Sequence, residues 1–435
     1  MLNGEFTRDL DRSEVYYELI DRTWSMNAVG AAELEESFPT SRVEEAWNEL
    51  AAQIPIVGAR VERASGHEAH LVFGTPHGSL AVGEHVDVAS AWAAEARSAF
   101  EMATGPLVRC SVVQRDSGTT LVIAAHHSAL DGKYVIELLT LLATALTTSS
   151  SDIGDHELTE PTVGLHEAGG GPPAGRPRLA DQVATAREMR NEDGYVANAG
   201  PFTWYDDSID PPRDPGFAFF ELSEAETSGL IGWARSQQAT VHGALSAAMV
   251  NAAVSLSPEL ERVGLSASVD LRSRFGSPDR GCIGLAAGVL SGSYDSTVDS
   301  GELARVVSAD TRRRFDRGEG ELLYALSGVG RLPVDDNADK VIRQWTEQAT
   351  PTIFQGNLGM VSVSAPPALR QFAVGMAPIP NQVAVVVAST FRRRLSLTVG
   401  YDRNRFSIDP EGFAATLHEH VLALARAGER SAALR

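Results

Sequence analysis

The spacing of apolar residues along the chain predicts helices and strands in alternation. A first clear helix begins at Ser41, whose hydroxyl can cap the backbone while Glu44 reaches back. The apolar positions of this helix fall on one face: Val43, Trp47, Leu50 and Ile54. Strands are expected at 56–61 and 70–73, and a second helix at 90–102.

The next pattern is a β-hairpin that leads to a pair of histidines. Strand 107–114 is followed by a glycine-containing turn and by an apolar run at 119–125. Residues 134–147 then have the apolar spacing of a helix that packs on a core. His126 and His127 therefore stand where a buried strand ends and a helix is about to begin.

A change in composition separates the two halves of the chain. Residues 148–215 are rich in Ser, Gly and Pro around one helical stretch at 179–191, which indicates a crossing between lobes. Ser223 and Glu226 form a second capping box. The remaining elements are expected as a strand at 217–222, a helix at 240–256, strands at 263–269, 359–364, 382–390 and 394–401, and a closing helix at 410–427. Because both halves mix strands and helices, the fold class is α/β or α+β.

Length and composition limit what the protein can be. Because 435 residues exceed what one core usually holds, we expect two lobes, at 1–190 with the crossing and at 215–435. A formal net charge of -20 argues against nucleic acid as a partner. No apolar run approaches the roughly 18 residues of a membrane span, and residues 1–17 lack the apolar core of a secretory signal. Cys110 and Cys282 have apolar neighbours, as buried thiols in a reducing compartment do. These features predict a cytoplasmic protein.

The chemistry is concentrated in residues 126–132, which read His-His-Ser-Ala-Leu-Asp-Gly. A histidine held at a strand end can present a neutral imidazole, whose pKa of about 6.5 suits removal of a proton from an alcohol or amine. Adjacent strand residues point to opposite faces, so only one of the two histidines faces a given substrate. The other must be packed or hydrogen-bonded.

This segment matches His-His-x-x-x-Asp-Gly at every fixed position and resembles the signature of a superfamily of acyltransferases. That superfamily contains chloramphenicol acetyltransferases, condensation domains of nonribosomal peptide synthesis, plant BAHD acyltransferases and polyketide-associated acyltransferases. Other stretches also resemble it: Gly105-Pro106-Leu107-Val108-Arg109, Ile54-Pro55-Ile56, Val269-Asp270-Leu271-Arg272 and Asn357-Leu358-Gly359. The Asp-Phe-Gly-Trp-Gly motif of the plant enzymes is missing. The chain is therefore most similar to the condensation-domain-like and polyketide-associated branch, with enzymes such as phthiocerol dimycocerosyl transferase.

The resemblance implies an α+β two-layer sandwich in two chloramphenicol-acetyltransferase-like lobes, a pseudo-dimer with a central channel and no need of a second subunit. His127 would be the general base that deprotonates a hydroxyl or amine of a small-molecule acceptor. The acceptor would attack the thioester of an acyl-coenzyme A or acyl carrier protein, with phosphopantetheine as co-substrate, no permanently bound cofactor or metal, and no acyl-enzyme. Asp131 would pair with Arg272 across the lobes, and Gly132 would offer an amide to the oxyanion.

The other residues of the pattern would have supporting or alternative roles. His126 would be a packing residue, and Asn357 would support the site or only form a turn. Arg274 is an alternative partner to Arg272. Asp131 can also cap the following helix, which is compatible with the ion pair. The arginine runs at 312–314 and 392–394 are either solvated surface or a dock for an acidic carrier protein or coenzyme A phosphates: Arg312, Arg313, Arg314, Arg392, Arg393 and Arg394.

Two rival functions stay open beside acyl transfer. The same histidines can move protons in epimerisation, dehydration or cyclisation of a carrier-bound intermediate. A catalytically silent carrier-binding protein is a third possibility, which the complete motif argues against. Other chemistries are excluded: His67 and His70 lack the i, i+4 spacing of a zinc helix, and the sequence has neither a phosphate-binding loop nor a Gly-x-Ser-x-Gly elbow.

Overall fold

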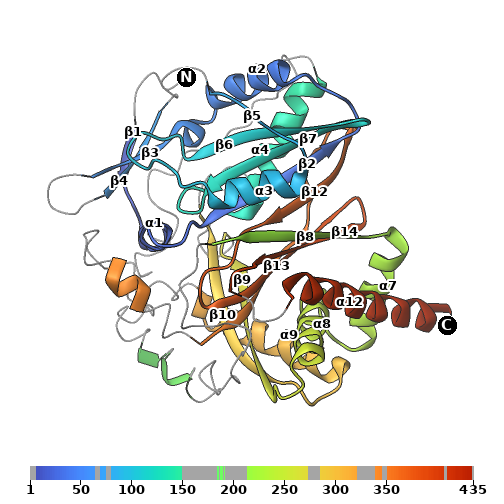
Figure 1. Cartoon of the computed structure of the whole chain (residues 1–435). Coiled ribbons are helices and arrows are strands. Elements are labelled where there is room, and N and C mark those ends of the chain that lie inside the picture. Colours follow the sequence, from blue (N-terminus) through green and yellow to red (C-terminus); the bar gives the residue numbers. More distant parts are fainter. Residues whose placement is uncertain are drawn as a thin grey trace.

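The computed structural model places the chain in two α/β lobes that lie against each other (Figure 1). It describes these residues: 6–63, 69–74, 80–148, 213–272, 285–320, 339–344, 350–405, 409–433 and a few between 184 and 191. The helix expected at 179–191 lies largely outside them, as do Cys282 and Arg274. The expected mixed class is confirmed, since each lobe has a sheet covered by helices.

The first lobe is built on a five-stranded sheet whose outermost strand comes from the second half of the chain. In spatial order its strands are β12 (Leu369–Gly375), β2 (Asn27–Leu34), β7 (Gly118–His126), β6 (Val108–Arg115) and β5 (Gly83–His85). Strand β12 runs antiparallel to β2, with Val374 opposite Gly30. The lobe boundaries predicted from sequence stay a prediction, but the sheets do not follow chain order.

Helices cover both faces of this sheet. The helical elements of the region are α1 (Arg12–Asp21), α2 (Thr40–Ala51), the 3-10 turn η1 (Pro55–Gly58), α3 (Val88–Arg97) and α4 (Gly132–Thr147). On one face of the sheet, Gly30 lies against Val135 and Leu139 of α4. On the opposite face, Val29 packs with Trp92 of α3. A small sheet of β1 (Phe6–Asp9), β4 (Ala69–Phe73) and β3 (Arg60–Arg63) lies beside α1.

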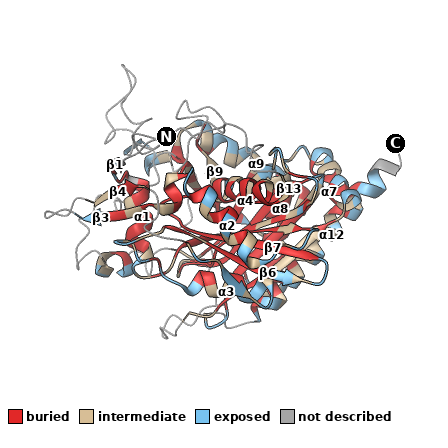
Figure 2. Cartoon of the chain, turned by 90° about the horizontal axis from the view of Figure 1, so that it is seen from above, coloured by how far each residue is buried: buried red, intermediate tan, exposed pale blue. Residues whose placement is uncertain are grey.

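The second lobe contains a six-stranded sheet. In spatial order its strands are β10 (Ala287–Asp295), β9 (Arg262–Asp270), β11 (Thr352–Met360), β13 (Gln382–Phe391), β14 (Arg394–Asp402) and β8 (Pro215–Leu222). Its helices are α7 (Glu224–Ser236), α8 (Val241–Leu256), α9 (Ser300–Asp316) and α12 (Pro410–Ala433). Helix α8 is buried along most of its length, so its sequence shows no polar face (Figure 2).

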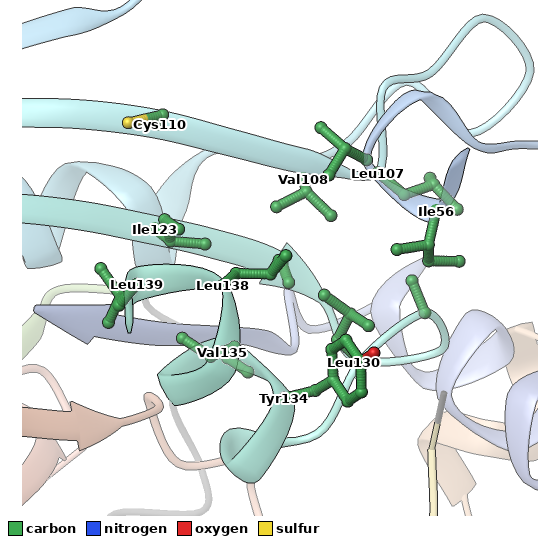
Figure 3. Packing of buried hydrophobic residues seen from close by; sticks show 14 of the residues in the cluster. Ile56, Leu107, Val108, Cys110, Ile123, Leu130, Tyr134, Val135, Leu138 and Leu139 are labelled. Carbon is green, nitrogen blue, oxygen red and sulfur yellow. The ribbon is translucent and has the colours of Figure 1, made fainter. Parts of the chain in front are cut away.

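Apolar packing fixes the position of the histidine pair. Strand β7 is buried at every residue, and Leu138 and Leu139 of α4 belong to the same apolar cluster as Ile123 of β7, all labelled in Figure 3. Leu130, between β7 and α4, belongs to the same core and is fully buried. The motif therefore connects two elements that cannot shift independently.

Several local predictions from the sequence need correction. The box of Ser41 with Glu44 is wrong, because α2 begins one residue earlier, after Pro39, without a side-chain cap. The strand expected at 56–61 is the 3-10 turn η1 followed by β3, because Pro55 can begin a helical turn. The strand expected at 359–364 is β11, which ends at Met360. The helix expected at 90–102 is α3, which ends at Arg97.

Other local predictions are confirmed. Ser223 and Glu226 form the expected capping box at α7, and the hairpin before the motif is the β6–β7 pair. Within the described residues, no helix by itself has the length and apolar character to cross a membrane; α7 and α8 pass together only as a pair bent by 96°.

Candidate active site

The motif spans the junction between β7 and α4. His126 is the last residue of β7, and Gly132 is the first residue of α4. The two histidines point in different directions, as adjacent residues at a strand end should. His126 is fully buried in the first lobe, while His127 lines a cavity between the lobes.

His126 is a hydrogen-bonded residue as well as a packed one. Its Nδ1 lies 2.6 Å from Ser128 Oγ and accepts the Ser128 backbone N–H at 3.2 Å. Its Nε2 lies 3.2 Å from Oδ2 of Asp21 at the end of α1. The expectation of a packing residue was therefore incomplete, because Nδ1 is hydrogen-bonded and Nε2 lies close to a carboxylate.

His127 presents its imidazole to the cavity from a buried position. It is 9% exposed, and its ring stacks on Tyr17 of α1 with centroids 4.2 Å apart and planes 15° apart. Burial lowers the pKa of His127 below its ordinary value of 6.5, while its own backbone carbonyl and the carboxylate of Asp131 act in the opposite direction. The ring is therefore neutral near pH 7, as a general base must be.

Asp131, at the cavity wall, accepts hydrogen bonds from four donor groups. Nη2 of Arg272 lies 3.0 and 2.9 Å from its two carboxylate oxygens, and the Ala286 amide donates to Oδ2 at 3.1 Å. The backbone amides of Lys133 and Tyr134 donate to Oδ1 at 3.1 and 3.3 Å, so Asp131 is also the N-cap of α4. The helix cap and the ion pair of Asp131 coexist, as the sequence allowed. The ion pair is formed with Arg272, the expected partner.

A second ion pair across the lobes adjoins the first. Asp270 accepts from Lys133 Nζ at 2.6 Å and from Arg272 Nη1 at 3.1 Å. Burial alone would lower the pKa of Arg272, but the carboxylates of Asp131 and Asp270 raise it above its ordinary value. Two cations and two carboxylates thus alternate across the interface at the cavity wall.

The cavity has about 730 Å³ of empty space, part of it open to solvent, and residues from both lobes line it. Strands β9, β10, β11 and β13 of the six-stranded sheet contribute many of these residues. The lining is mainly apolar or small: Ala28, Val269, Ala286, Ala287, Val289, Phe354, Gly356, Leu358, Val374, Gly375, Met376 and Val387. Its polar members are Tyr17, His127, Asp131, Lys133, Ser268, Asp270, Arg272 and Asn357.

Gly132 and Asn357 also lie at the cavity. A Cβ atom on Gly132 would come within 3.1 Å of Val374 Cγ1 and 3.4 Å of Leu358 Cδ2, so the glycine leaves space between these side chains. Asn357 lines the cavity, and its Oδ1 accepts the Gly359 backbone N–H at 3.0 Å. Asn357 therefore touches the cleft from within strand β11 rather than standing in a turn.

The arginine runs give no support to a docking patch. Arg314 is 2% exposed and bonds to Asp310 and Glu319, and Arg313 bonds to Asp310. Arg394 contacts Glu221, Arg393 lies 3.7 Å from Glu224, and Arg392 donates to the carbonyls of Pro366 and Pro367. Most of these positive charges already face acidic side chains.

Sequence reasoning missed the contribution of α1. Tyr17 and Asp21 contact one motif histidine each, but no helix was predicted over residues 12–21. The signal available was a pair of residues four apart, which face the same side of a helix. That spacing alone does not tell which distant residues the pair meets. Among the described residues, no group of three His, Cys, Asp or Glu side chains is arranged to hold a metal ion.

Comparison with known proteins bears on the class of fold and on the second half of the chain. Residues 211–400, somewhat less than half of the chain, match the model of the family described as phthiocerol/phthiodiolone dimycocerosyl transferase C-terminus. No curated protein sequence matches the chain.

Solved structures share the fold over nearly their whole length. Polyketide synthase associated protein 5 from Mycobacterium tuberculosis is similar with a TM-score of 0.62 at 15% identity, covering 97% of this chain and 99% of that one. Trichothecene 15-O-acetyltransferase from Fusarium sporotrichioides has a TM-score of 0.64 at 13% identity, covering 97% and 95%. The epimerization domain of tyrocidine synthetase B has a TM-score of 0.62 at 14% identity, covering 98% and 99%.

Fold, motif and family match define the class of protein. Residues 211–400 match a family of acyltransferases, and the whole chain shares its two-lobe fold with condensation-domain-like enzymes. Both findings agree with the resemblance to polyketide-associated acyltransferases that the sequence predicted.

Proposed function

We propose that the protein transfers an acyl group from a phosphopantetheine thioester to a hydroxyl or amine of a small specialised metabolite. The donor is acyl-coenzyme A or an acyl carrier protein. The observation that carries the proposal is the position of His127, whose ring lines a cavity between the lobes while burial keeps it neutral. A neutral imidazole at such a surface can take the acceptor proton.

The reaction needs no covalent enzyme intermediate. His127 removes the proton of the acceptor as its oxygen or nitrogen attacks the thioester carbonyl, and the tetrahedral intermediate collapses to release the thiolate, which takes up the proton. The motif's own serine, Ser128, is 2% exposed and bonded to His126, so it is poorly placed as a nucleophile. Gly132, at the start of α4, is our candidate for an amide donor to the oxyanion.

The wall of the cavity supports an apolar acyl group. Its sheet face presents small and branched side chains such as Ala287, Val289 and Val387, which offer no hydrogen bonds to a polar chain. The charges of Lys133, Asp270 and Arg272 pair among themselves at the same wall. Because one chain supplies both sides of the site, a second copy is not needed to complete it.

A second candidate is proton transfer on a carrier-bound intermediate. The epimerization domain and the cyclization-docking bidomain among the solved structures have TM-scores of 0.62 and 0.65 to this chain, no lower than that of the polyketide-associated protein. Fold similarity therefore does not favour one chemistry over the other. The same neutral His127 would serve as base in both.

Acyl transfer is tested with a panel of acyl-coenzyme A thioesters and alcohols or amines, following free thiol and product mass. His127→Ala should lower kcat by about 10²- to 10⁴-fold. The matched control is His85→Ala. His85 lies on β5, which contributes no residue to the cavity, so this variant should keep the wild-type rate. Thiol release that does not depend on His127 contradicts the proposal. Deuterium uptake from D₂O into a carrier-bound substrate without thiol release would establish the second candidate instead.

A further inference from the structure

Helix α1 contacts both histidines of the motif from one side. Tyr17 and Asp21 are four residues apart, so their side chains lie on the same face of the helix. The Tyr17 ring stacks on His127, and the Asp21 carboxylate lies 3.2 Å from Nε2 of His126. One helical turn thus touches two adjacent residues that themselves point in different directions.

Asp21 fixes the strand end that carries the motif. Because Nδ1 of His126 accepts the Ser128 amide, the ring proton lies on Nε2, which is 3.2 Å from Oδ2 of Asp21. The other oxygen of Asp21 accepts the Met26 amide at 2.7 Å, and the Met26 carbonyl accepts the His127 amide at 3.2 Å. A continuous path of hydrogen bonds therefore joins Asp21 to the backbone of His127.

Tyr17 limits the orientation of the His127 ring. The two rings are nearly parallel, 15° apart, and Tyr17 is only 6% exposed, so little free volume lets the imidazole rotate out of its plane. Tyr17 also lines the cavity, so it covers one face of the imidazole at the reaction site. A base must lie within hydrogen-bond reach of the proton it removes, which makes ring orientation decisive for its rate.

We propose that Tyr17 and Asp21 of α1 are positioning residues for the acyltransferase base, Tyr17 by stacking on His127 and Asp21 by holding His126 and the backbone beside it. The inference rests on the proposed function, since it gives α1 a part in the same reaction. It assigns no contact with substrate to Asp21.

The groups that face this site come from four elements. Tyr17 and Asp21 belong to α1, His126 to β7, Asp131 and Lys133 to the start of α4, and Asp270 and Arg272 to the end of β9. Arg213 contributes a further positive charge near Asp21. Burial would raise the pKa of Asp21, but the neighbouring imidazole of His126 and the Met26 amide hold it below its usual value, so Asp21 remains a carboxylate at neutral pH.

The test for Tyr17 compares Tyr17→Phe, Tyr17→Leu and Tyr17→Met with the control Tyr16→Leu, which removes the neighbouring ring of the same helix at similar burial. Tyr17→Phe keeps the stack and should retain kcat within about twofold. Tyr17→Leu and Tyr17→Met should lower kcat about 10- to 100-fold with little change in KM, and the control should not. They should also raise the pKa of His127 toward 6.5, because water replaces a covering ring.

The pKa of His127 is read by NMR titration of histidine labelled at Cε1, with the signal assigned by its loss in His127→Gln. This readout does not depend on acyl transfer, so the two proposals fail separately. If no donor reacts but the titration still moves in Tyr17→Leu, only the proposed function fails. The positioning role of Tyr17 is overturned if kcat falls equally in Tyr17→Leu, Tyr17→Met and Tyr16→Leu and the pKa of His127 does not change.

Asp21 is tested by Asp21→Asn beside the wild type. The amide keeps the shape but loses the charge that complements the Nε2–H of His126, so kcat should fall about 10-fold at unchanged KM. Asp21→Glu, which restores a carboxylate on a longer side chain, should recover part of that loss. A wild-type kcat in folded Asp21→Asn overturns the part of Asp21.

Discussion

A single guanidinium nitrogen of Arg272 contacts both carboxylate oxygens of Asp131, a residue 141 positions earlier in the chain and in the other lobe. Both side chains are almost fully buried, at 8% and 5% exposed. The ion pair therefore connects the motif to the second lobe at the wall of the cavity. Loss of the ion pair should lower the unfolding free energy more than it lowers the activity.

Arg272→Ala leaves the carboxylate of Asp131 buried without its cation, which typically costs about 3 to 5 kcal/mol of unfolding free energy. We expect a loss of this size in urea denaturation. Arg272→Lys keeps the charge but loses the planar guanidinium. Its unfolding free energy should therefore lie between those of the wild type and Arg272→Ala. A change below about 1 kcal/mol in Arg272→Ala would show that the two lobes are held together without this pair.

The pH dependence of kcat/KM should show a base whose pKa lies below 6.5. A general base works only when unprotonated, so kcat/KM falls as pH drops through the pKa of His127, which burial lowers. The rate should therefore be level through neutrality and decline in more acidic solution, with its midpoint below pH 6.5. An acidic limb centred at or above 6.5 would contradict the desolvated position of the ring.

Gly132→Ala should narrow the cavity without weakening the fold. The new Cβ would lie 3.1 Å from Val374 Cγ1 and near Leu358, and alanine favours a helix over glycine by up to about 1 kcal/mol. We expect unchanged or slightly higher stability and a roughly 10-fold lower kcat/KM. Gly232→Ala on α7, where a Cβ meets nothing within 4 Å, is the matched control and should leave kinetics unaltered.

Filling the apolar wall should change which acyl chains are accepted. Val289 lines the cavity from β10, so Val289→Phe shortens the space available. Selectivity should shift toward shorter acyl groups by about 10- to 200-fold in the ratio of kcat/KM, the range for one missing methylene in an apolar pocket. Val306→Phe, on the exposed surface of α9, should keep the wild-type ratio. An unchanged ratio in Val289→Phe would place the acyl chain elsewhere.

His242 should make the protein less stable in acid. Burial lowers its pKa from 6.5 to about 4, so between these values the unfolded chain binds a proton that the folded chain does not. The unfolding free energy therefore decreases as pH falls through this range, by roughly 3 kcal/mol in total. His242→Gln should reduce the difference in urea stability between pH 7 and pH 4.5, whereas His85→Gln should not.

The hairpin, the junction of strand and helix, and the capping box at α7 were predictable because each depends on residues close in sequence. Strand β2 was not, although it is an interior strand of its sheet, between β12 and β7. Its sequence, Asn-Ala-Val-Gly-Ala-Ala-Glu-Leu, is rich in residues that are rare in strands, and it is buried on both faces, so no alternation marks it. Helix packing on both sides, seen at Gly30, decides its conformation.

The pairing of Asp131 with Arg272 was expected from a family resemblance rather than from the residues themselves. Nothing local to either residue indicates a partner 141 positions away. The same limit explains why Tyr17 and Asp21 were missed, since their targets lie more than a hundred residues further along the chain. Composition and periodicity describe elements, whereas a site depends on which elements meet.

Strand β12 has a consequence for how the polypeptide is made. The amino-terminal sheet obtains the partner of β2 from Leu369–Gly375, so on the ribosome most of the chain has emerged before that sheet can close. Until then β2 offers an unpaired edge, the kind of surface that nascent chains use to stick to one another. Synthesis of a truncated product that stops before Leu369 should therefore yield insoluble material rather than an independent half-enzyme.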